Sequence, residues 1–146
     1  MATKSGKNTN NSKFRIKEDA PRLTPLDIER DRLKSPDEGV SISLKYYRKD
    51  SECFSAWQSS ELKKFSAALE KISGQTAKDL KSYKPLCVKH KGPPAAKRFS
   101  RPDSLSEDLD FYEIKIDASN KARVHGVFVD SIFFLVWLDR QHAVFP

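Results

Sequence analysis

The sequence contains few of the features that mark secreted, metal-binding or membrane-spanning chains. Its two cysteines, Cys53 and Cys87, are too few for a disulfide framework and stand in no metal-ligand spacing, so both are expected to be packed thiols. No apolar run approaches the roughly 20 residues that a membrane helix needs. The N-terminal stretch MATKSGKNTNNSKF has no apolar segment of the secretory type. We therefore expect a cytoplasmic protein without a membrane partner.

The common catalytic and phosphate-binding motifs are also absent. The sequence contains no glycine-rich phosphate loop, no HExxH or GxSxG pattern and no paired-carboxylate motif. It therefore predicts neither a cofactor nor a metal site. A length of 146 residues fits one domain with a tail, and no internal repeat is visible.

Positive charge is concentrated in one segment, residues 84–101. This segment contains six Lys and Arg residues and no Asp or Glu, whereas residues 102–146 contain four basic and eight acidic residues. Such a focused basic segment is typical of a protein that binds a polyanion, with nucleic acid as the first candidate and a solvated loop without a partner as the alternative. Phe99 within it either stacks on a base or packs the segment onto the core. The cations predicted to contact nucleic acid are Lys89, Lys91, Lys97, Arg98, Arg101 and Arg140.

Hydrophobic periodicity divides the chain into a tail and a domain. Residues 1–39 are polar and charged without a sustained period, which predicts a flexible tail with a short docking helix near 25–33. Residues 40–146 are expected to form one folded domain. The predicted elements are a strand at 40–47, a helix at 59–74, a second helix from 76 to about 83, the basic loop at 84–101, and strands at 111–116, 122–129 and 132–139.

This order predicts an α+β domain in which a helical hairpin covers one face of a sheet that ends in an antiparallel three-stranded meander. Ser59 or Ser60 is expected to cap the long helix, Gly74 to end it in a left-handed conformation, and Thr76 to cap the second helix. The last strand is apolar on both faces, so it needs a second cover, from the N-terminal tail or a bound partner. Strict alternation places Phe133, Leu135 and Trp137 on one face and Phe134, Val136 and Leu138 on the other.

Polar side chains interrupt the apolar C-terminal stretch at positions suited to chemistry on a phosphodiester. Arg123 and His125 lie two apart on one predicted strand and share a face, while His142 follows the next strand. Metal-free RNA cleavage needs a base, an acid and cations beside the phosphate, and His and Arg can supply these. His90, in the basic KHKG cluster, is a further acid–base candidate. The alternatives are a salt bridge between Arg123 and Glu113 and histidines that only bond to their neighbours.

The order of elements and the C-terminal residues resemble the RelE/ParE superfamily of bacterial toxins. The stretches that carry the resemblance are PLCVKHKG, FYEIKI, KARVHGVFV and IFFLVWLDRQHAVFP, within residues 40–146. RelE-like and YoeB-like toxins have a basic loop after a helical hairpin, a strand with an aromatic start, an Arg-containing strand and a strand that ends near a His or Tyr. This chain departs from that pattern in its longer N-terminal tail, its extended basic loop and its lack of a terminal Tyr.

The resemblance implies a toxin-type endoribonuclease that cleaves mRNA by metal-free acid–base chemistry, with the ribosome as a candidate partner and an antitoxin as a protein partner. It matches Arg123 to a phosphate-gripping Arg and His142 to a near-terminal His, and His90 and His125 are the other catalytic candidates. Two alternatives stay open: a non-catalytic nucleic-acid-binding or gyrase-inhibiting ParE-like protein, and a regulatory protein that binds an acidic partner. No oligomeric state is predicted.

Overall fold

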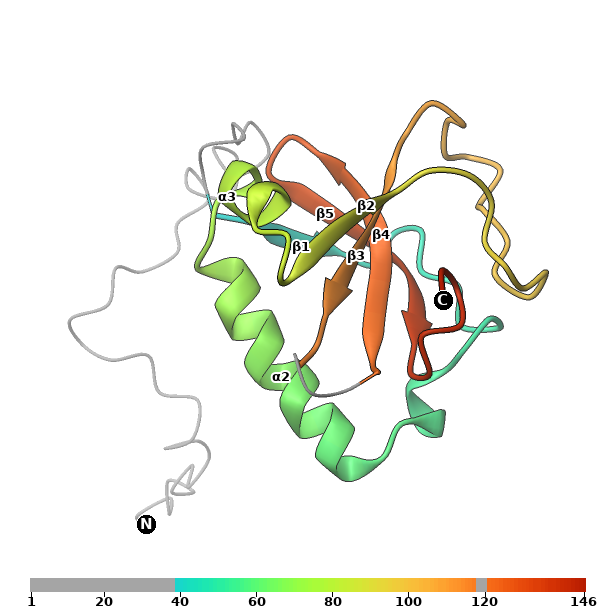
Figure 1. The fold of residues 1–146 in the computed structure, drawn as a ribbon, viewed down its shortest axis with the longest axis horizontal. Helices are drawn as coiled ribbons and strands as arrows, with labels where there is room; N and C mark the ends of the chain where they lie inside the picture. The colour runs from blue at the N-terminus through green and yellow to red at the C-terminus, as the bar shows by residue number, and fades with distance from the viewer. Residues whose placement is uncertain (1–38, 118–120) are drawn as a thin grey trace, which may run out of the picture. The chain divides into compact units, whose positions relative to one another are not determined.

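The computed structural model describes residues 39–117 and 121–146. Their architecture is α+β, as predicted, with a five-stranded mixed sheet that carries two α-helices on one face (Figure 1). The predicted tail at 1–39, including its short helix, lies outside the described residues except for Gly39. Within the described part, no helix is long and apolar enough to cross a bilayer.

A mixed sheet forms the frame of the domain. Its strands are β1 (Ser41–Ser43), β2 (Cys87–His90), β3 (Phe111–Lys115), β4 (Arg123–Val129) and β5 (Ile132–Asp139). Their order in space is β1-β5-β4-β3-β2, with β1 parallel to β5 and the other pairs antiparallel. The predicted tight hairpin between β4 and β5 is confirmed, and Asp130 in its turn adopts a φ of 52°, which Asp tolerates.

The long helix, α2 (Ser59–Ser73), covers one face of this sheet. Its N-cap is Gln58, and not Ser59 or Ser60 as expected: the backbone amide of Gln58 donates a hydrogen bond to the Glu61 carboxylate at 2.9 Å. Gly74 follows the last turn with a φ of −82°, which any residue can adopt. The left-handed end that we expected at Gly74 is therefore wrong.

The second helix, α3 (Ala77–Ser82), begins as predicted. The Thr76 hydroxyl accepts a hydrogen bond from the Asp79 amide at 3.1 Å, which satisfies one of the free amides of the first turn. A short 3-10 turn (Phe54–Ala56) lies between β1 and α2 in the chain. Both α-helices lie on the same side of the sheet in Figure 1.

The sheet has one strand more than the sequence predicts. Residues 87–90 are expected in the basic loop, but they form the edge strand β2, which pairs with β3 from Cys87–Ile114 to His90–Phe111. Four residues that include a Lys and a His give too short and too polar a pattern to reveal a strand. The first strand is also shorter than the predicted 40–47, since the chain turns at residues 45 and 46.

A β-bulge in β5 decides which side chains share a face of the sheet. His125 pairs with Trp137, whereas the next residue, Gly126, pairs with Leu135, so Val136 is an extra residue on β5. Val136 and Trp137 therefore both belong to the apolar cluster on one face, and the alternation reverses beyond them. The prediction that Trp137 shares a face with Leu135 is wrong because strict alternation does not allow for this extra residue.

Gly126 permits the close approach of β4 and β5 at the bulge. A Cβ atom at this position would lie 2.1 Å from the carbonyl oxygen of Phe134 and 2.7 Å from the ring of Phe133, so only glycine fits. The Val136 carbonyl accepts a hydrogen bond from the Arg48 amide at 2.9 Å, outside the β4–β5 ladder. The bulge is thus fixed by the close approach of Gly126 on the β4 side and by the hydrogen bond from Arg48 to Val136.

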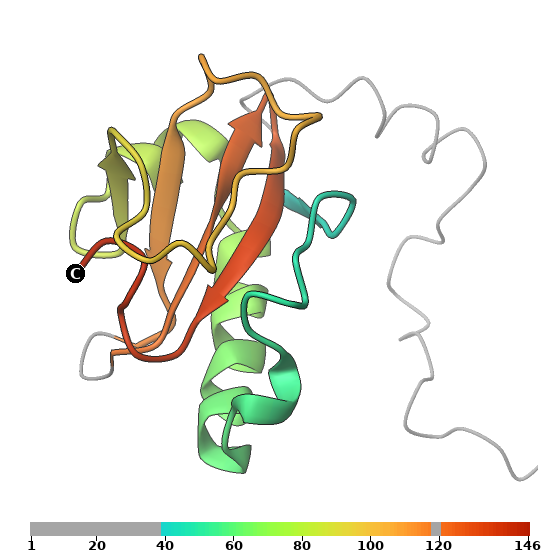
Figure 2. The same ribbon diagram turned by 90° about the vertical axis from the view of Figure 1, so that its right-hand side faces the viewer.

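Apolar side chains pack on both faces of the sheet. Phe65 and Leu80 of the two helices belong to the cluster on one face. On the other face, Phe99 is 2% exposed and packs with Leu105 against Trp137. Figure 2 shows the segment that joins β2 to β3 crossing this second face. The cover that the sequence assigned to the tail or a partner is therefore provided by this segment and by residues 143–145, and the packing role of Phe99 is confirmed.

The two cysteines have different environments. Cys87 is buried on the helix side of the sheet, and burial raises its pKa to about 12, so its thiol stays protonated near neutral pH. Cys53 is exposed, which contradicts the expectation that both thiols are packed.

We expect Gly126→Ala to lower the free energy of unfolding by about 2 kcal/mol or more, because the new methyl group would overlap the backbone of the neighbouring strand. Gly74→Ala is the matched control, since its Cβ would meet only contacts at 3.6 Å and beyond, and it should change stability by about 0.5 kcal/mol at most. Urea denaturation of the two variants measures the difference. Equal stabilities would show that the close approach at Gly126 is not a constraint.

Candidate functional site

The three histidines of the chain lie together on the face of the sheet opposite the helices. His90 ends β2, His125 lies in β4 and His142 follows β5. The rings of His90 and His125 are 6.5 Å apart, and both His90 and His142 contact Glu113 of β3. The three predicted catalytic histidines, far apart in the sequence, are therefore neighbours in space.

Glu113 is the centre of this cluster, and its side chain is only 4% exposed. Its Oε1 atom lies 3.0 Å from Nε2 of His142 and 3.5 Å from Nε2 of His90, and its Oε2 atom lies 3.6 Å from Nε of Arg123. These are ion-pair distances without the alignment of hydrogen bonds. A buried carboxylate is costly unless a positive charge balances it, and the Arg123 guanidinium provides that charge beside Glu113.

Arg123 forms the salt bridge with Glu113 that the sequence left open as an alternative to phosphate binding. Its Nη1 atom also donates a hydrogen bond to the carbonyl of Ala122 at 3.1 Å. The side chain is 10% exposed, so most of the guanidinium is turned to the protein.

A second acid–histidine pair lies beside the first and is completely buried. Nε2 of His125 is 2.9 Å from Oδ2 of Asp139, and both side chains have no exposed surface. Asp139 is paired with Arg123 across the β4–β5 ladder, and the bulge at Val136 turns its carboxylate to the histidine face. Without the extra residue, the alternation of β5 would direct Asp139 toward the helices.

The carboxylate of Asp139 also holds the end of the chain in place. Its oxygens accept hydrogen bonds from the amides of Ala143, at 2.7 Å, and Val144, at 3.0 Å. This turn needs His142 to adopt a left-handed φ of 55°, which is uncommon for a residue other than Gly, Asn or Asp. Asp139 thereby brings His142 back over the sheet to Glu113.

Phe145 closes one side of the cluster. Its ring stacks on His90 at a centroid distance of 4.3 Å and an interplanar angle of 9°, and it meets His125 edge-on at 5.6 Å. The preceding residue, Val144, accepts a hydrogen bond from the Ala95 amide at 2.8 Å, so the chain end is tied to the basic segment. The side chains of His90 and His142 keep 23% and 32% of their surface exposed, which makes them the accessible members of the cluster.

The environment shifts the pKa values of two members of the cluster. Burial lowers the pKa of His90 below its ordinary value; the Glu113 carboxylate acts in the opposite direction but only partly offsets this, and His125 lowers it further. Burial alone would raise the pKa of Asp139. The hydrogen bonds from His125 and from the amides of Ala143 and Val144 outweigh that effect, so the pKa of Asp139 lies below its usual range. At neutral pH the cluster therefore contains a neutral His90 and an ionised Asp139.

Two of the predicted nucleic-acid contacts serve the fold of the basic segment. Lys89 forms an exposed ion pair with Asp110 at 3.3 Å. The Arg101 guanidinium donates hydrogen bonds to the carbonyls of Ser106 and Leu109, the latter at 3.1 Å, and lies 4.7 Å from the centre of the Phe111 ring. Arg101 thus holds the segment that covers the sheet.

The other three predicted contacts in the basic segment are exposed. Lys91 and Lys97 are exposed, and Arg98 is exposed while its guanidinium lies 4.7 Å from the centre of the Phe99 ring. Since Ala95, in the same segment, bonds to Val144, these cations belong to a loop that is tied to the chain end beside His90. Lys91, which directly follows His90 in the chain, is the exposed cation of this group that borders the candidate site.

Arg140 is the predicted site residue that lies elsewhere. Its Nε atom donates a hydrogen bond to Oε1 of Glu61 at 2.6 Å, and its amide donates to Oε2 of Glu52 at 2.8 Å. It joins the end of β5 to the start of α2. These contacts give Arg140 a structural role, which the sequence did not predict.

Sequence reasoning missed Asp139 and Phe145 and gave Glu113 only a structural role. Glu113 could have been found from its position, since it shares a predicted strand face with Phe111 opposite the strand that carries His125. Asp139 and Phe145 offered no such signal, because their places depend on the bulge and on the turn that follows it.

No match was found for the chain among protein-family models, curated proteins or solved structures. In residues 39–117 and 121–146, no three His, Cys, Asp or Glu side chains are arranged to hold a metal ion.

We expect Asp139→Asn to lower the free energy of unfolding at pH 7 by about 2–4 kcal/mol, because it removes the charge that the buried His125 and two backbone amides bind. Asp130→Asn is the matched control: the residue is exposed in a turn with positive φ, which Asn also tolerates, and its effect should stay within about 0.5 kcal/mol. Urea denaturation measures both variants.

The pH dependence of the same variant has a definite sign. Folding lowers the pKa of Asp139, so its carboxylate stabilises the protein above an unfolded pKa of about 3.9 and this stabilisation is lost as the pH falls through the lower folded pKa. The stability difference between wild type and Asp139→Asn should therefore shrink as the solution is acidified below about pH 4. A difference that grows on acidification would contradict the assignment.

We expect the pKa of His90, followed by NMR of its ring proton, to lie below the ordinary value of about 6.5. Glu113→Gln should lower it further, because the substitution removes the carboxylate that favours the charged imidazole. Glu107→Gln, at an exposed position, is the control and should leave the titration unchanged. A His90 pKa that rises in the Glu113 variant would disprove the arrangement.

Proposed function

We propose that the chain is a metal-independent endoribonuclease of the RelE-like toxin type, in which His90 and His142 act on the RNA backbone. The observation that carries the proposal is the convergence of all three histidines with Glu113 and Arg123 on one face of the sheet, at an edge bordered by exposed cations. Sequence resemblance alone suggested the activity, and this convergence gives it a chemical basis.

The two accessible histidines have the arrangement that acid–base catalysis needs. In each ring Nε2 contacts Glu113, so Nδ1 is the nitrogen left to exchange a proton with substrate. A carboxylate behind an imidazole orients the ring and stabilises its charged form, as in other acid–histidine sites. Glu113 therefore acts as a positioning residue, and Arg123 fixes the second oxygen of that carboxylate.

The proposed reaction transfers the phosphoryl group within the RNA from the 5′-oxygen to the neighbouring 2′-oxygen. The neutral His90 removes the proton of a 2′-hydroxyl, the 2′-oxygen attacks the adjacent phosphorus, and the bond from phosphorus to the 5′-oxygen breaks. A protonated His142 gives its proton to the departing 5′-oxygen. The products are a 2′,3′-cyclic phosphate and a 5′-hydroxyl, and exchange of protons between the two histidines through water restores the site.

Exposed cations beside the histidines supply attraction for the RNA backbone. Lys91, Lys97 and Arg98 are exposed on the segment that borders the site, and such charges neutralise phosphates with little dependence on base sequence. Weak intrinsic positioning of RNA would favour a substrate that is held by the ribosome. An antitoxin that covers the same cations is the protein partner in this proposal.

The experiment that tests the function is an RNA cleavage assay with the full chain, run on free RNA in EDTA and on mRNA in a translating extract that keeps its Mg²⁺. We expect cleavage that leaves 2′,3′-cyclic phosphate ends, no cleavage of DNA, and a loss of about 100-fold or more in rate for His142→Gln and for His90→Gln. Lys91→Gln with Lys97→Gln should weaken RNA binding, whereas Lys63→Gln with Lys78→Gln, exposed positions on the helices, should not.

Intact RNA in both assays would rule out the nuclease. If the wild type leaves RNA intact but binds it through Lys91 and Lys97, the non-catalytic alternative is supported instead. Histidine variants that stay folded by circular dichroism and cleave at the wild-type rate would show that the cluster is only structural.

A further inference from the structure

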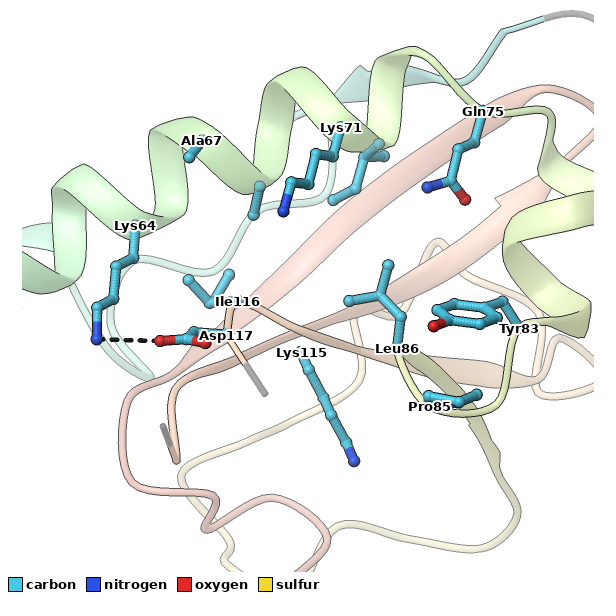
Figure 3. A pocket seen from close by; sticks show the side chains of 12 residues that line it. Lys64, Ala67, Lys71, Gln75, Tyr83, Pro85, Leu86, Lys115, Ile116 and Asp117 are labelled. Carbon is cyan, nitrogen blue, oxygen red and sulfur yellow. Dashed lines mark ion pairs between the residues drawn. The ribbon is translucent and has the colours of Figure 1, made fainter. Parts of the chain in front are cut away.

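A cavity of about 440 Å³ lies on the helix side of the domain, away from the histidine cluster (Figure 3). One wall is a stripe of α2 residues spaced three and four apart, from Lys64 to Ile72, and Gln75 just beyond the helix continues it. The other is the segment between α3 and β2, and the end of β3 forms the floor. Its volume lies within the range of about 300–1,000 Å³ that is usual for small-molecule sites.

Small side chains at the middle of the helical stripe create the hollow. Ala67 and Ala68 lie between the long side chains of Lys64 and Lys71, and they leave the space above Leu86 and Ile116 unfilled. The second wall is joined to the floor by a backbone hydrogen bond of 2.9 Å from the Lys115 amide to the Leu86 carbonyl. The position of the second wall over the floor is therefore fixed by the backbone.

The polar groups at the rim are mainly hydrogen-bond donors, and they carry little negative charge. In Figure 3, Lys71 extends from α2 toward the side of Ile116, and Gln75, just beyond the helix, extends toward Leu86 and Tyr83. Lys64 is already neutralised by Asp117 at 3.0 Å. Lys71, by contrast, pairs with no carboxylate within the described ranges 39–117 and 121–146, and the Tyr83 side chain is 54% exposed.

We propose that this cavity binds a small organic anion, a carboxylate with a compact aromatic or aliphatic body. The ammonium of Lys71, the Gln75 amide and the Tyr83 hydroxyl bind the carboxylate, and the hydrocarbon lies against Leu86 and Ile116. An apolar floor with a few donors at one side is the usual composition of such sites, and a neutral ligand would leave the charge of Lys71 without a counterpart.

The probe is 4-phenylbutyrate, compared with the neutral 4-phenylbutanol, in an NMR titration of the ¹⁵N-labelled full chain. We expect saturable shifts of the amides along the α2 stripe, at Leu86 and at Ile116, and clearly weaker binding of the alcohol. Lys71→Gln should reduce the affinity about tenfold, the loss of one charge-assisted contact. Lys63→Gln, an exposed lysine of α2 outside the cavity, should stay within about twofold of wild type.

Ala67→Phe gives an independent test, because it fills the hollow from an exposed helix position and should abolish binding while the chain stays folded. The proposal is overturned by the absence of saturable shifts with the acid, by equal affinity for the alcohol, or by unchanged affinity in either cavity variant. Because the histidine cluster lies on the opposite face, the outcome is independent of RNA cleavage.

Discussion

The extra residue at Val136 is the constraint on which the rest of the site depends. By adding one residue to β5 opposite Gly126, it reverses the alternation of that strand and turns Asp139 to the face that already carries His125. Asp139 then binds the buried histidine and, through the amides of Ala143 and Val144, folds the chain end back over the sheet. One local irregularity thus creates both the buried pair and the turn that positions His142.

Electrostatic balance explains why so many ionisable groups tolerate burial on one face. Each carboxylate has its own partners: Glu113 has Arg123 and two histidines, and Asp139 has His125 and two amides. In the basic segment, Arg101 and Phe99 hold the chain on the sheet. The cations Lys91, Lys97 and Arg98 stay exposed to solvent. A single segment therefore covers the core and presents exposed positive charge.

Much of the fold could be predicted from the sequence, because β3, β4, β5 and both helices have clear periodicity and Asp130–Ser131 is a recognisable hairpin turn. The shared face of Arg123 and His125 followed from the same rule. The bulge could not be predicted, since nothing in IFFLVWLD distinguishes the extra residue. Consequently the faces of Trp137 and Asp139 were unpredictable, and so was the return of the chain end to Glu113. The edge strand β2 was hidden by its polar residues.

The most direct test of the central claim is whether RNA contacts the face on which the histidines converge. The full chain is titrated with an RNA oligonucleotide whose 2′-O-methyl groups prevent cleavage, while NMR follows the histidine ring signals and the backbone amides. The account predicts that the His90 and His142 signals and the amides of residues 91–98 shift together, and that those of α2 stay in place. Shifts confined to α2 and α3, or histidine signals that do not move at saturation, would contradict it.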